Sequence, residues 1–498
     1  MQPAHLDRLV TLSVPSLHPA GWAVVGATRP DFTSDSYTGQ LWRVPLKGGE
    51  PRRITRGFRD TAPKVSPDGR VIAFLRATGP AERPQLAIVD AQGGEPHVVT
   101  DQKLGVLDFA FTPDSTRLVF VAAVPEEGRH GTLDGVDAKA EDPRRFSTLQ
   151  FQLNGRGWTP DQRRHVFLLD LPDPADEPVF APVGRAAQGS DKPKLVPEAR
   201  QLTEGDFDHA EPAATNEAVV VAAARHDDRD ANLRQDLYLV PFDGGEPRLL
   251  TRTAATWLEA KAPVIADGQV YFLAADIGPD GRDFVARNNA VYRVGLAGGE
   301  PVRLTDPAAT DFHGLFGPAP GGEGVVGVVF DGGQGKPHLV TPDGLATPLP
   351  LPDNASAEAL ATAPGQPVVA TVATQQSPGE LAVLDASPHV VTAFGRALAE
   401  AGPAVVPQPF TATSPDGAQV HGWVFLPDGP GPHPVLLNIH GGPYYAFGPA
   451  FFDEAQVYAA AGYAVVQANP RGSAGYGEDW GQAIVGDFGN LDSVDVLS

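Results

Sequence analysis

The most chemically suggestive motif in the sequence is His440-Gly441-Gly442-Pro443, which closes the nearly continuous apolar run HPVLLNIH. Such a run is typical of a strand buried on both faces. An acyl-transfer enzyme needs backbone N–H groups aimed at the oxygen on which negative charge develops. Glycines let an amide approach a carbonyl with no Cβ in the way. The motif is therefore interpreted as an oxyanion turn, with a plain strand-to-helix turn as the alternative.

A second motif, Arg471-Gly472-Ser473-Ala474-Gly475, is close to the nucleophile elbow G-x-S-x-G. The elbow needs small residues around a strained turn, and here an arginine takes the place of the first glycine. We therefore do not expect Ser473 to be a nucleophile, and no G-x-S-x-G occurs elsewhere in the 498 residues. His440 ends a strand beside the turn and is interpreted as structural rather than as the catalytic base.

The elements that hold these two motifs are expected to form an α/β sheet. HPVLLNIH is followed by PAFFDEAQVYAAAG, whose apolar residues recur at helical spacing and whose final glycine suits a C-cap. YAVVQANP then gives a second strand of the buried type. The order strand, helix, strand predicts parallel strands joined by a right-handed crossover.

A repeat fills the first four-fifths of the chain. The string G-G-E-P recurs between short apolar strands at Gly48–Pro51, Gly93–Pro96, Gly244–Pro247 and Gly298–Pro301. Counting periods by their final threonines gives ends at Thr55, Thr100, Thr203, Thr251, Thr305, near Thr347 and at Thr392. Periods of this size with about four strands each predict a β-propeller of about seven blades. An array of hairpins in β-sandwich domains is the alternative, and the excess of the third period, about 126–160, is expected to be a long loop.

Composition narrows the choice of partners and location. Lys plus Arg number 38 and Asp plus Glu 61, a net charge of −23 that repels phosphate backbones, so no nucleic-acid partner is expected. Cysteine is absent, which excludes disulfides, thiolate catalysis and zinc–thiolate sites. No apolar run is long enough to span a membrane, and no secretory signal is seen. A soluble, cytoplasmic protein with no membrane partner is expected, and homo-oligomerisation is left open.

PVLLNIHGGP, YAVVQANPRGSAGYG and GDFGN after a repeat-built propeller resemble the prolyl oligopeptidase family. The H-G-G-P and N-P-R-G-S-x-G-Y-G forms are most similar to its acylaminoacyl-peptidase branch, and the resemblance covers essentially the whole chain. It implies a serine hydrolase that acts on short peptides without a metal or organic cofactor, with the propeller restricting access to the site. It also implies that the amide of Gly442 is an oxyanion donor.

Three further residues near the two motifs are candidates for substrate contact. Tyr444 and Tyr445 directly follow the oxyanion turn and are candidates to line the substrate pocket or to pack in the core. Arg471 is a candidate to orient a substrate carbonyl or carboxylate, or to brace its own loop with hydrogen bonds. The resemblance implies that the catalytic Ser, Asp and His lie beyond Ser498, so residues 1–498 alone are expected to be inactive.

The sequence thus predicts a β-propeller at 1–395, whose first residues pack on the second domain, and the N-terminal part of an α/β-hydrolase domain at 396–498. The predicted function is a serine peptidase that cleaves short peptides, either an acylaminoacyl-peptidase or an oligopeptidase. The alternative is a non-catalytic propeller that binds peptides or proteins.

Overall fold

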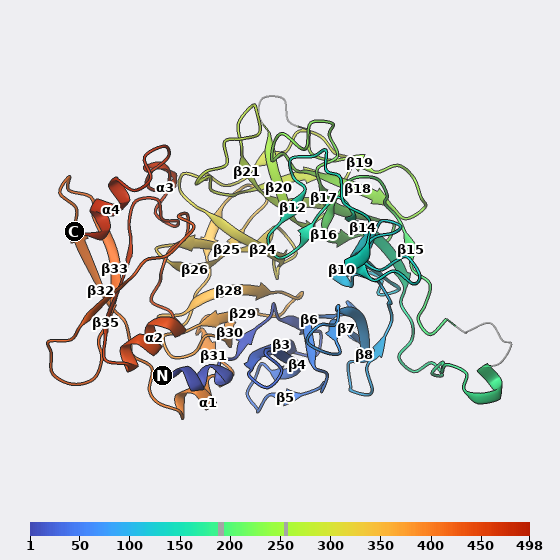
Figure 1. Cartoon of the computed structure of the whole chain (residues 1–498), viewed down its shortest axis with the longest axis horizontal. Helices are drawn as coiled ribbons and strands as arrows, with labels where there is room; N and C mark the ends of the chain where they lie inside the picture. The colour runs from blue at the N-terminus through green and yellow to red at the C-terminus, as the bar shows by residue number, and fades with distance from the viewer. Residues whose placement is uncertain (188–193, 253–256) are drawn as a thin grey trace.

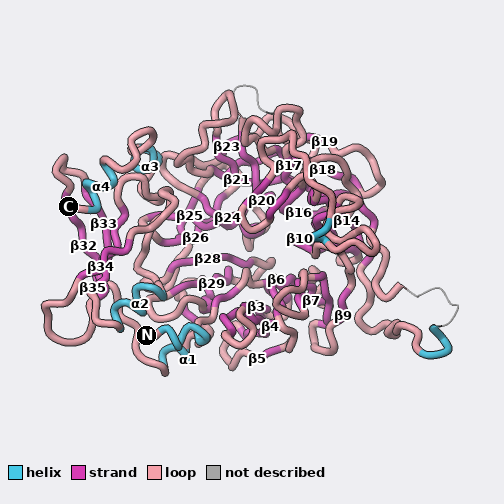
Figure 2. The backbone as a smooth tube through the Cα atoms, in the orientation of Figure 1, coloured by secondary structure: helices cyan, strands magenta, loops and turns pink. Residues whose placement is uncertain are grey.

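Seven antiparallel blades form a ring, and a small α/β sheet lies beside it, in the computed structural model (Figure 1). The structure describes residues 1–187, 194–252 and 257–498. Figure 2 shows that strands dominate the ring and that the few helices lie mainly near the two chain ends. The fold class predicted from the repeats, a propeller of about seven blades followed by part of an α/β-hydrolase domain, is confirmed.

Strands enter the first three blades in chain order. Blade 1 comprises β1 (Thr11–Leu12), β2 (Ser16–His18), β3 (Trp22–Asp31), β4 (Ser36–Pro45) and β5 (Arg52–Arg53). Blade 2 comprises β6 (Arg59–Val65), β7 (Val71–Ala77), β8 (Gln85–Asp90) and β9 (His97–Val98). Blade 3 comprises β10 (Val106–Phe111), β11 (Arg117–Pro125), β14 (Gln162–Asp170) and β15 (Arg200–Gln201).

The other four blades repeat this plan. Blade 4 comprises β16 (His209–Ala214), β17 (Ala218–Ala223), β18 (Asp236–Pro241) and β19 (Arg248–Leu249). Blade 5 comprises β20 (Leu258–Ala266), β21 (Gln269–Asp276), β22 (Ala290–Gly295) and β23 (Val302–Arg303). Blade 6 comprises β24 (Phe312–Pro318), β25 (Val325–Asp331), β26 (Gln334–Val340) and β27 (Ala346–Pro348). Blade 7 comprises β28 (Ser356–Ala361), β29 (Val368–Ala373), β30 (Glu380–Leu384) and β31 (His389–Val390).

Inner blade strands are apolar on both faces because each blade is packed between two others. In β17 all six residues are buried. Val219 and Val221 pack against blade 3, whereas Val220 packs against blade 5. Successive side chains of the strand therefore pack against the two neighbouring blades in turn. Both faces of the strand are buried, which explains why the inner strands of the repeat are continuously apolar.

The threonine that ends each sequence repeat has a structural role. After the Gly-Gly turn, Thr55 Oγ1 accepts a hydrogen bond from the Leu41 amide of the preceding strand at 3.0 Å. Thr100 and Thr305 make the equivalent bonds to strand amides, each at 2.9 Å. The hydroxyl thus satisfies a buried donor where the short fourth strand stops pairing. Equivalent bonds occur at Thr203, Thr251 and Thr392.

The ring closes between blades 7 and 1 by side-chain packing. Among the described residues, the sheet of blade 7 contains only β28, β29, β30 and β31, so blades 1 and 7 share no strand. Leu17 and Val25 of blade 1 pack with Val369 and Leu381 of blade 7 in one apolar cluster. Thr371 Oγ1 adds a hydrogen bond to the Ser13 carbonyl at 3.0 Å.

A long connection leaves blade 3 between β11 and β14, where the sequence predicts a loop. It contains η2 (Ala138–Ala140) and the small hairpin of β12 (Gln152–Leu153) and β13 (Gly157–Trp158). The connection from β14 to β15 contains η3 (Gly184–Ala187).

The α/β sheet contains four strands in the order β32, β33, β35, β34. Its elements are β32 (Gln408–Thr413), β33 (Gln419–Phe425), β34 (Val435–Asn438), α2 (Asp453–Ala460), β35 (Ala464–Asn469), α3 (Glu478–Gln482) and α4 (Leu491–Val496). β34 and β35 are parallel and joined through α2, as the pattern predicts. β34 lies at the sheet edge, where Val435 is 68% exposed and Ile439, just after the strand, is 61% exposed.

The two parts meet through blade connections between second and third strands. The Gly332 amide, between β25 and β26, donates to the Gly475 carbonyl at 2.9 Å. The Phe451 amide donates to the Thr374 carbonyl, between β29 and β30, at 2.8 Å. The α/β sheet therefore docks on the face of the ring formed by these connections.

The chain start lies beside the chain segment that joins the two parts. η1 (Pro3–Arg8) contacts α1 (Arg396–Ala399), and Arg8 donates to the Ala397 carbonyl at 3.4 Å. The domain bounds 1–395 and 396–498 stay a prediction. Among the described residues, no helix is both long and apolar enough to cross a membrane.

Candidate active site

The Gly-rich turn after β34 presents an unpaired backbone amide. Gly442 has φ +124°, in the region that favours glycine, and a Cβ there would lie 2.9 Å from the Tyr444 nitrogen. Its N–H has no acceptor among the described residues, and the residue is exposed. A free amide held in a conformation that excludes larger residues suits stabilisation of a developing oxyanion.

His440, at the start of this turn, is bonded to the neighbouring loop. Its Nε2 lies 3.0 Å from Ser473 Oγ. The Ser473 hydroxyl also donates to the Pro470 carbonyl at 2.6 Å. Nδ1 of His440 lies 3.1 Å from the Gly441 carbonyl. Burial lowers the pKa of His440, against the opposing effect of that carbonyl. The ring therefore links the oxyanion turn to the neighbouring loop.

Ser473 is wholly buried, with 0% exposure. Its oxygen is enclosed by the contacts to His440 and Pro470, which also accepts from Trp480 Nε1 at 2.9 Å. A nucleophile must reach a substrate carbonyl, which this oxygen cannot do.

Asn469 clamps the chain that follows the oxyanion turn, and sequence reasoning did not single it out. Its Oδ1 accepts from the Phe447 amide, and its Nδ2 donates to the Phe447 carbonyl, each at 2.9 Å. Nδ2 also lies 2.9 Å from the Tyr476 hydroxyl. The asparagine is fully buried, so all its bonding capacity fixes these two loops. Its position at the end of an apolar strand is the sequence feature that could have indicated this role.

Tyr444 connects the turn to the propeller. Its hydroxyl donates to Asn288 Oδ1 in the connection between β21 and β22. The Asn288 amide in turn donates to Glu478 Oε1 at 2.9 Å. Burial, together with the charges of Asp311 and Glu478, raises the pKa of Tyr444, so its hydroxyl stays protonated.

A cavity of about 350 Å³ lies between the turn and blades 6 and 7. Tyr444 and Tyr445 both line it, and their contact with substrate stays a prediction. The cavity also holds Gln467, a fully buried side chain whose amide N and O have no partner among the described residues. Its other walls include Phe316, Phe330, Phe447, Phe451 and Phe452. His313, Ser356 and Glu358 add polar groups to the lining. A cavity with apolar walls and a few polar groups is typical of a small-ligand site.

Arg471 lies in the loop after β35 and faces Asp495 of α4. Its Nε and Nη2 donate to the two carboxylate oxygens of Asp495 at 2.9 and 2.6 Å. Nη1 donates to Asp416 at 2.5 Å. Burial would raise the pKa of Asp495, but the Arg471 hydrogen bonds outweigh it and lower that pKa. These contacts brace the loop, and substrate contact by Arg471 stays a prediction.

Comparison with known proteins relates the end of the chain to one family. Residues 449–498 match the model of the prolyl oligopeptidase family, and the match includes the Asn469 and Arg471 loop. This part of the chain is therefore similar to that family.

One curated relative and several solved structures are similar to nearly the whole chain. An uncharacterized peptidase, YuxL, of Bacillus subtilis (strain 168) is 25% identical over 99% of this chain and 74% of its own length. Pyrococcus horikoshii acylaminoacyl peptidase has the same fold, with a TM-score of 0.76 and 20% identity over 99% of this chain and 70% of its own. A Mycobacterium tuberculosis puromycin-hydrolyzing peptidase gives a TM-score of 0.65 and 18% identity over 100% of this chain and 72% of its own.

The structure brings Gly442 and Tyr444 together in one turn beside the cavity. Arg471 lies in the adjacent loop but is turned toward Asp495. The roles of Gly442, Tyr444 and Arg471 toward substrate stay predictions.

Proposed function

We propose that this chain forms the propeller and oxyanion turn of a serine peptidase that cleaves short peptides, acylated ones included. The observation that carries the proposal is the exposed, unpaired Gly442 amide beside the cavity lined by Tyr444 and Tyr445. The acylaminoacyl-peptidase fold likeness supports the substrate class.

The proposed chemistry is attack by a serine hydroxyl on a peptide or acyl carbonyl, with a histidine taking the proton. Negative charge passes to the carbonyl oxygen, and the Gly442 N–H stabilises it there. The nucleophile is assigned to no residue of this sequence, because the 498 residues contain no G-x-S-x-G and Ser473 is buried. The docked propeller would restrict access to peptides that fit between the two parts.

A second candidate function is peptide binding without catalysis, which the lack of an elbow within the 498 residues favours. A protein made from the complete gene should hydrolyse a chromogenic acyl-peptide and react with a fluorophosphonate probe. The 498-residue chain should do neither. A complete gene product that binds such peptides without turnover and without labelling would favour the second candidate. Cytoplasmic location, homo-oligomerisation and the lack of nucleic-acid partners stay predictions.

A further inference from the structure

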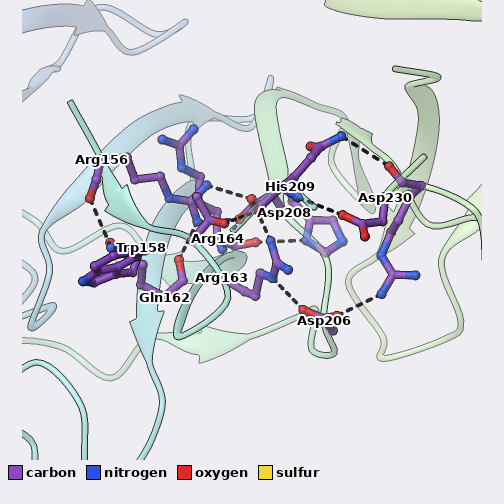
Figure 3. Close-up of polar contacts among 12 residues, drawn as sticks. Arg156, Trp158, Gln162, Arg163, Arg164, Asp206, Asp208, His209 and Asp230 are labelled. Carbon is purple, nitrogen blue, oxygen red and sulfur yellow. Dashed lines mark hydrogen bonds and ion pairs between the residues drawn. The ribbon is translucent and has the colours of Figure 1, made fainter. Parts of the chain in front are cut away.

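A pocket of about 550 Å³ lies between the start of β14, the start of β16 and the connection from β17 to β18. These chain segments belong to the same ring face on which the α/β sheet docks, because they adjoin connections between second and third strands. Figure 3 shows the arginines and aspartates of this cluster. Such a volume accommodates a few residues of a peptide.

Most acidic groups of this pocket are already engaged. Asp208 accepts from Arg156 at 2.7 and 2.8 Å and from the Arg164 amide at 2.9 Å (Figure 3). Asp206 pairs with Arg163 at 2.7 Å and with Arg229 at 2.9 Å.

The remaining acidic groups on the walls do not neutralise Arg164. Asp230 accepts from two backbone amides, at 2.7 and 2.9 Å. Glu211 accepts from the Ala262 amide at 2.7 Å. Asp227 is exposed and forms no ion pair within the described chain.

Arg164 is the cation left over. Its side chain lines the pocket, and within the described residues it has no hydrogen bond or ion pair. Its Nε is buried without an acceptor, as is Nε of Arg156. Burial and repulsion from Arg156 lower the pKa of Arg164, against attraction by Asp208. A half-buried guanidinium that has no ion-pair partner destabilises the fold unless a bound ligand supplies the negative charge.

A second arginine nearby also has no carboxylate partner in the part of the chain that the structure describes. Arg225 Nη1 lies 3.1 Å from His209 Nε2 and stacks over Phe207 at 4.7 Å. His209 Nδ1 is 3.0 Å from the Arg164 carbonyl, which can only accept, so Nδ1 carries the proton and Nε2 accepts from Arg225. Burial lowers the pKa of His209 to about 4, so the imidazole is neutral and offers Arg225 no charge.

We propose that this pocket, with Arg164 as its anchor, binds a carboxylate of a peptide substrate. The inference rests on the proposed peptidase function. It assigns this pocket to the part of the peptide substrate that lies away from the Gly442 amide. A planar guanidinium with free donors matches a carboxylate better than any neutral group. The carboxylate can be a peptide's C-terminus or an acidic side chain.

Binding to the 498-residue chain tests the inference without any turnover. Isothermal titration at low ionic strength would compare three probes: N-acetyl-tetraalanine as free acid, the same peptide as C-terminal amide, and an N-acetylated tetrapeptide amide with one internal glutamate. We expect the acid to bind about tenfold tighter than the amide, since a charge-assisted bond exceeds a neutral one by that order. Tight binding of the glutamate peptide would assign the site to acidic side chains, and weak binding would assign it to the C-terminus.

Variants locate the effect. Arg164→Gln should reduce the acid-to-amide ratio to about one, Arg164→Lys should keep part of it, and Arg248→Gln should leave it unchanged. Arg248 is a matched control because it is exposed and, among the described residues, its side chain donates to the Leu296 and Ala297 carbonyls and forms no ion pair. Thermal melting checks that each variant is folded.

Equal binding of acid and amide by the unmodified chain overturns the inference, and this comparison needs no variant. A ratio that survives Arg164→Gln also overturns it. If the complete gene product does not hydrolyse peptides, the proposed function fails while the measured carboxylate preference stands.

Discussion

The imidazole of His440 meets the hydroxyl of Ser473 at 3.0 Å and so ties the oxyanion turn to the loop after β35. The two residues are 33 positions apart, and both motifs could be read as catalytic from their neighbours alone. Their contact instead engages the serine oxygen and the Nε2 atom of the histidine. The pair is therefore a positioning device for the Gly442 amide.

Removal of this contact should be measurable as a coupling energy. Ser473→Ala and His440→Leu should each destabilise the α/β part by about 1–3 kcal/mol, since each removes one partner of the contact. The double variant should cost less than the sum of the two. The measurement is denaturant unfolding followed by hydrogen exchange of residues 400–498. Strict additivity of the two changes would contradict a direct bond between them.

Replacement of Gly442 should impair catalysis by the complete gene product more than binding. Gly442→Pro removes the N–H, and one oxyanion donor is worth roughly 10²–10³ in kcat. The measurement is kcat and KM on a chromogenic acyl-peptide. Gly441→Ala is the matched control, because a Cβ at Gly441 meets nothing within 4 Å. A folded Gly442→Pro enzyme with unchanged kcat would remove Gly442 from the site.

The Arg471–Asp495 pair should stabilise the loop strongly. Asp495 is only 2% exposed, so Asp495→Ala leaves Arg471 without its main partner and should cost about 3–5 kcal/mol. Asp416→Ala removes the partner whose side chain is 49% exposed and should cost much less, because water screens an exposed ion pair. Unfolding free energies from denaturant titration compare the two. Similar losses for both variants would show that burial does not set the strength of this network.

The buried histidine of blade 4 should make stability depend on pH. The folded pKa of His209 is about 4 and its unfolded value about 6.5, so its neutral form favours the native state. The contribution is fully present above pH 6.5 and is lost as pH falls toward 4, by about 3 kcal/mol. Burial also lowers the pKa of the neighbouring His165, which acts in the same direction.

Thermal melting between pH 7.5 and about pH 4 checks this dependence. His209→Gln keeps an acceptor for Arg225 and a donor for the Arg164 carbonyl, so its melting temperature should fall less steeply with acidification. An unchanged slope in this variant would assign the acid sensitivity to other groups.

The edge of the α/β sheet should be the first part of the 498-residue chain to open. Val435, Leu437 and Ile439 expose apolar surface along β34, and about 25 cal/mol is lost for each Å² left uncovered. Limited proteolysis should cut within 400–498 and leave a core of about 20–395. Resistance of 400–498, with early cuts inside the blades, would reverse this order of stability.

The sequence determined the features that depend on neighbours along the chain. Gly-Gly turns and alternating apolar strands predict blades, because turn and strand preferences act over a few residues. The threonine at the end of each repeat gives the number of blades. The apolar run before Gly442 likewise predicts a buried strand that ends in a glycine turn.

Tertiary structure alone decided which distant side chains meet. Arg471 could face a substrate or brace its loop, and its pairing with Asp495 depends on where α4 lies. Tyr444 bonds to Asn288, 156 positions away, only because the sheet docks on that face of the ring. Arg164 is one arginine among many in the sequence, and its lack of a partner appears only after Asp206 and Asp208 are seen to be engaged by other arginines. Local sequence sets backbone conformation, whereas charge pairing and burial depend on packing between segments far apart in the chain.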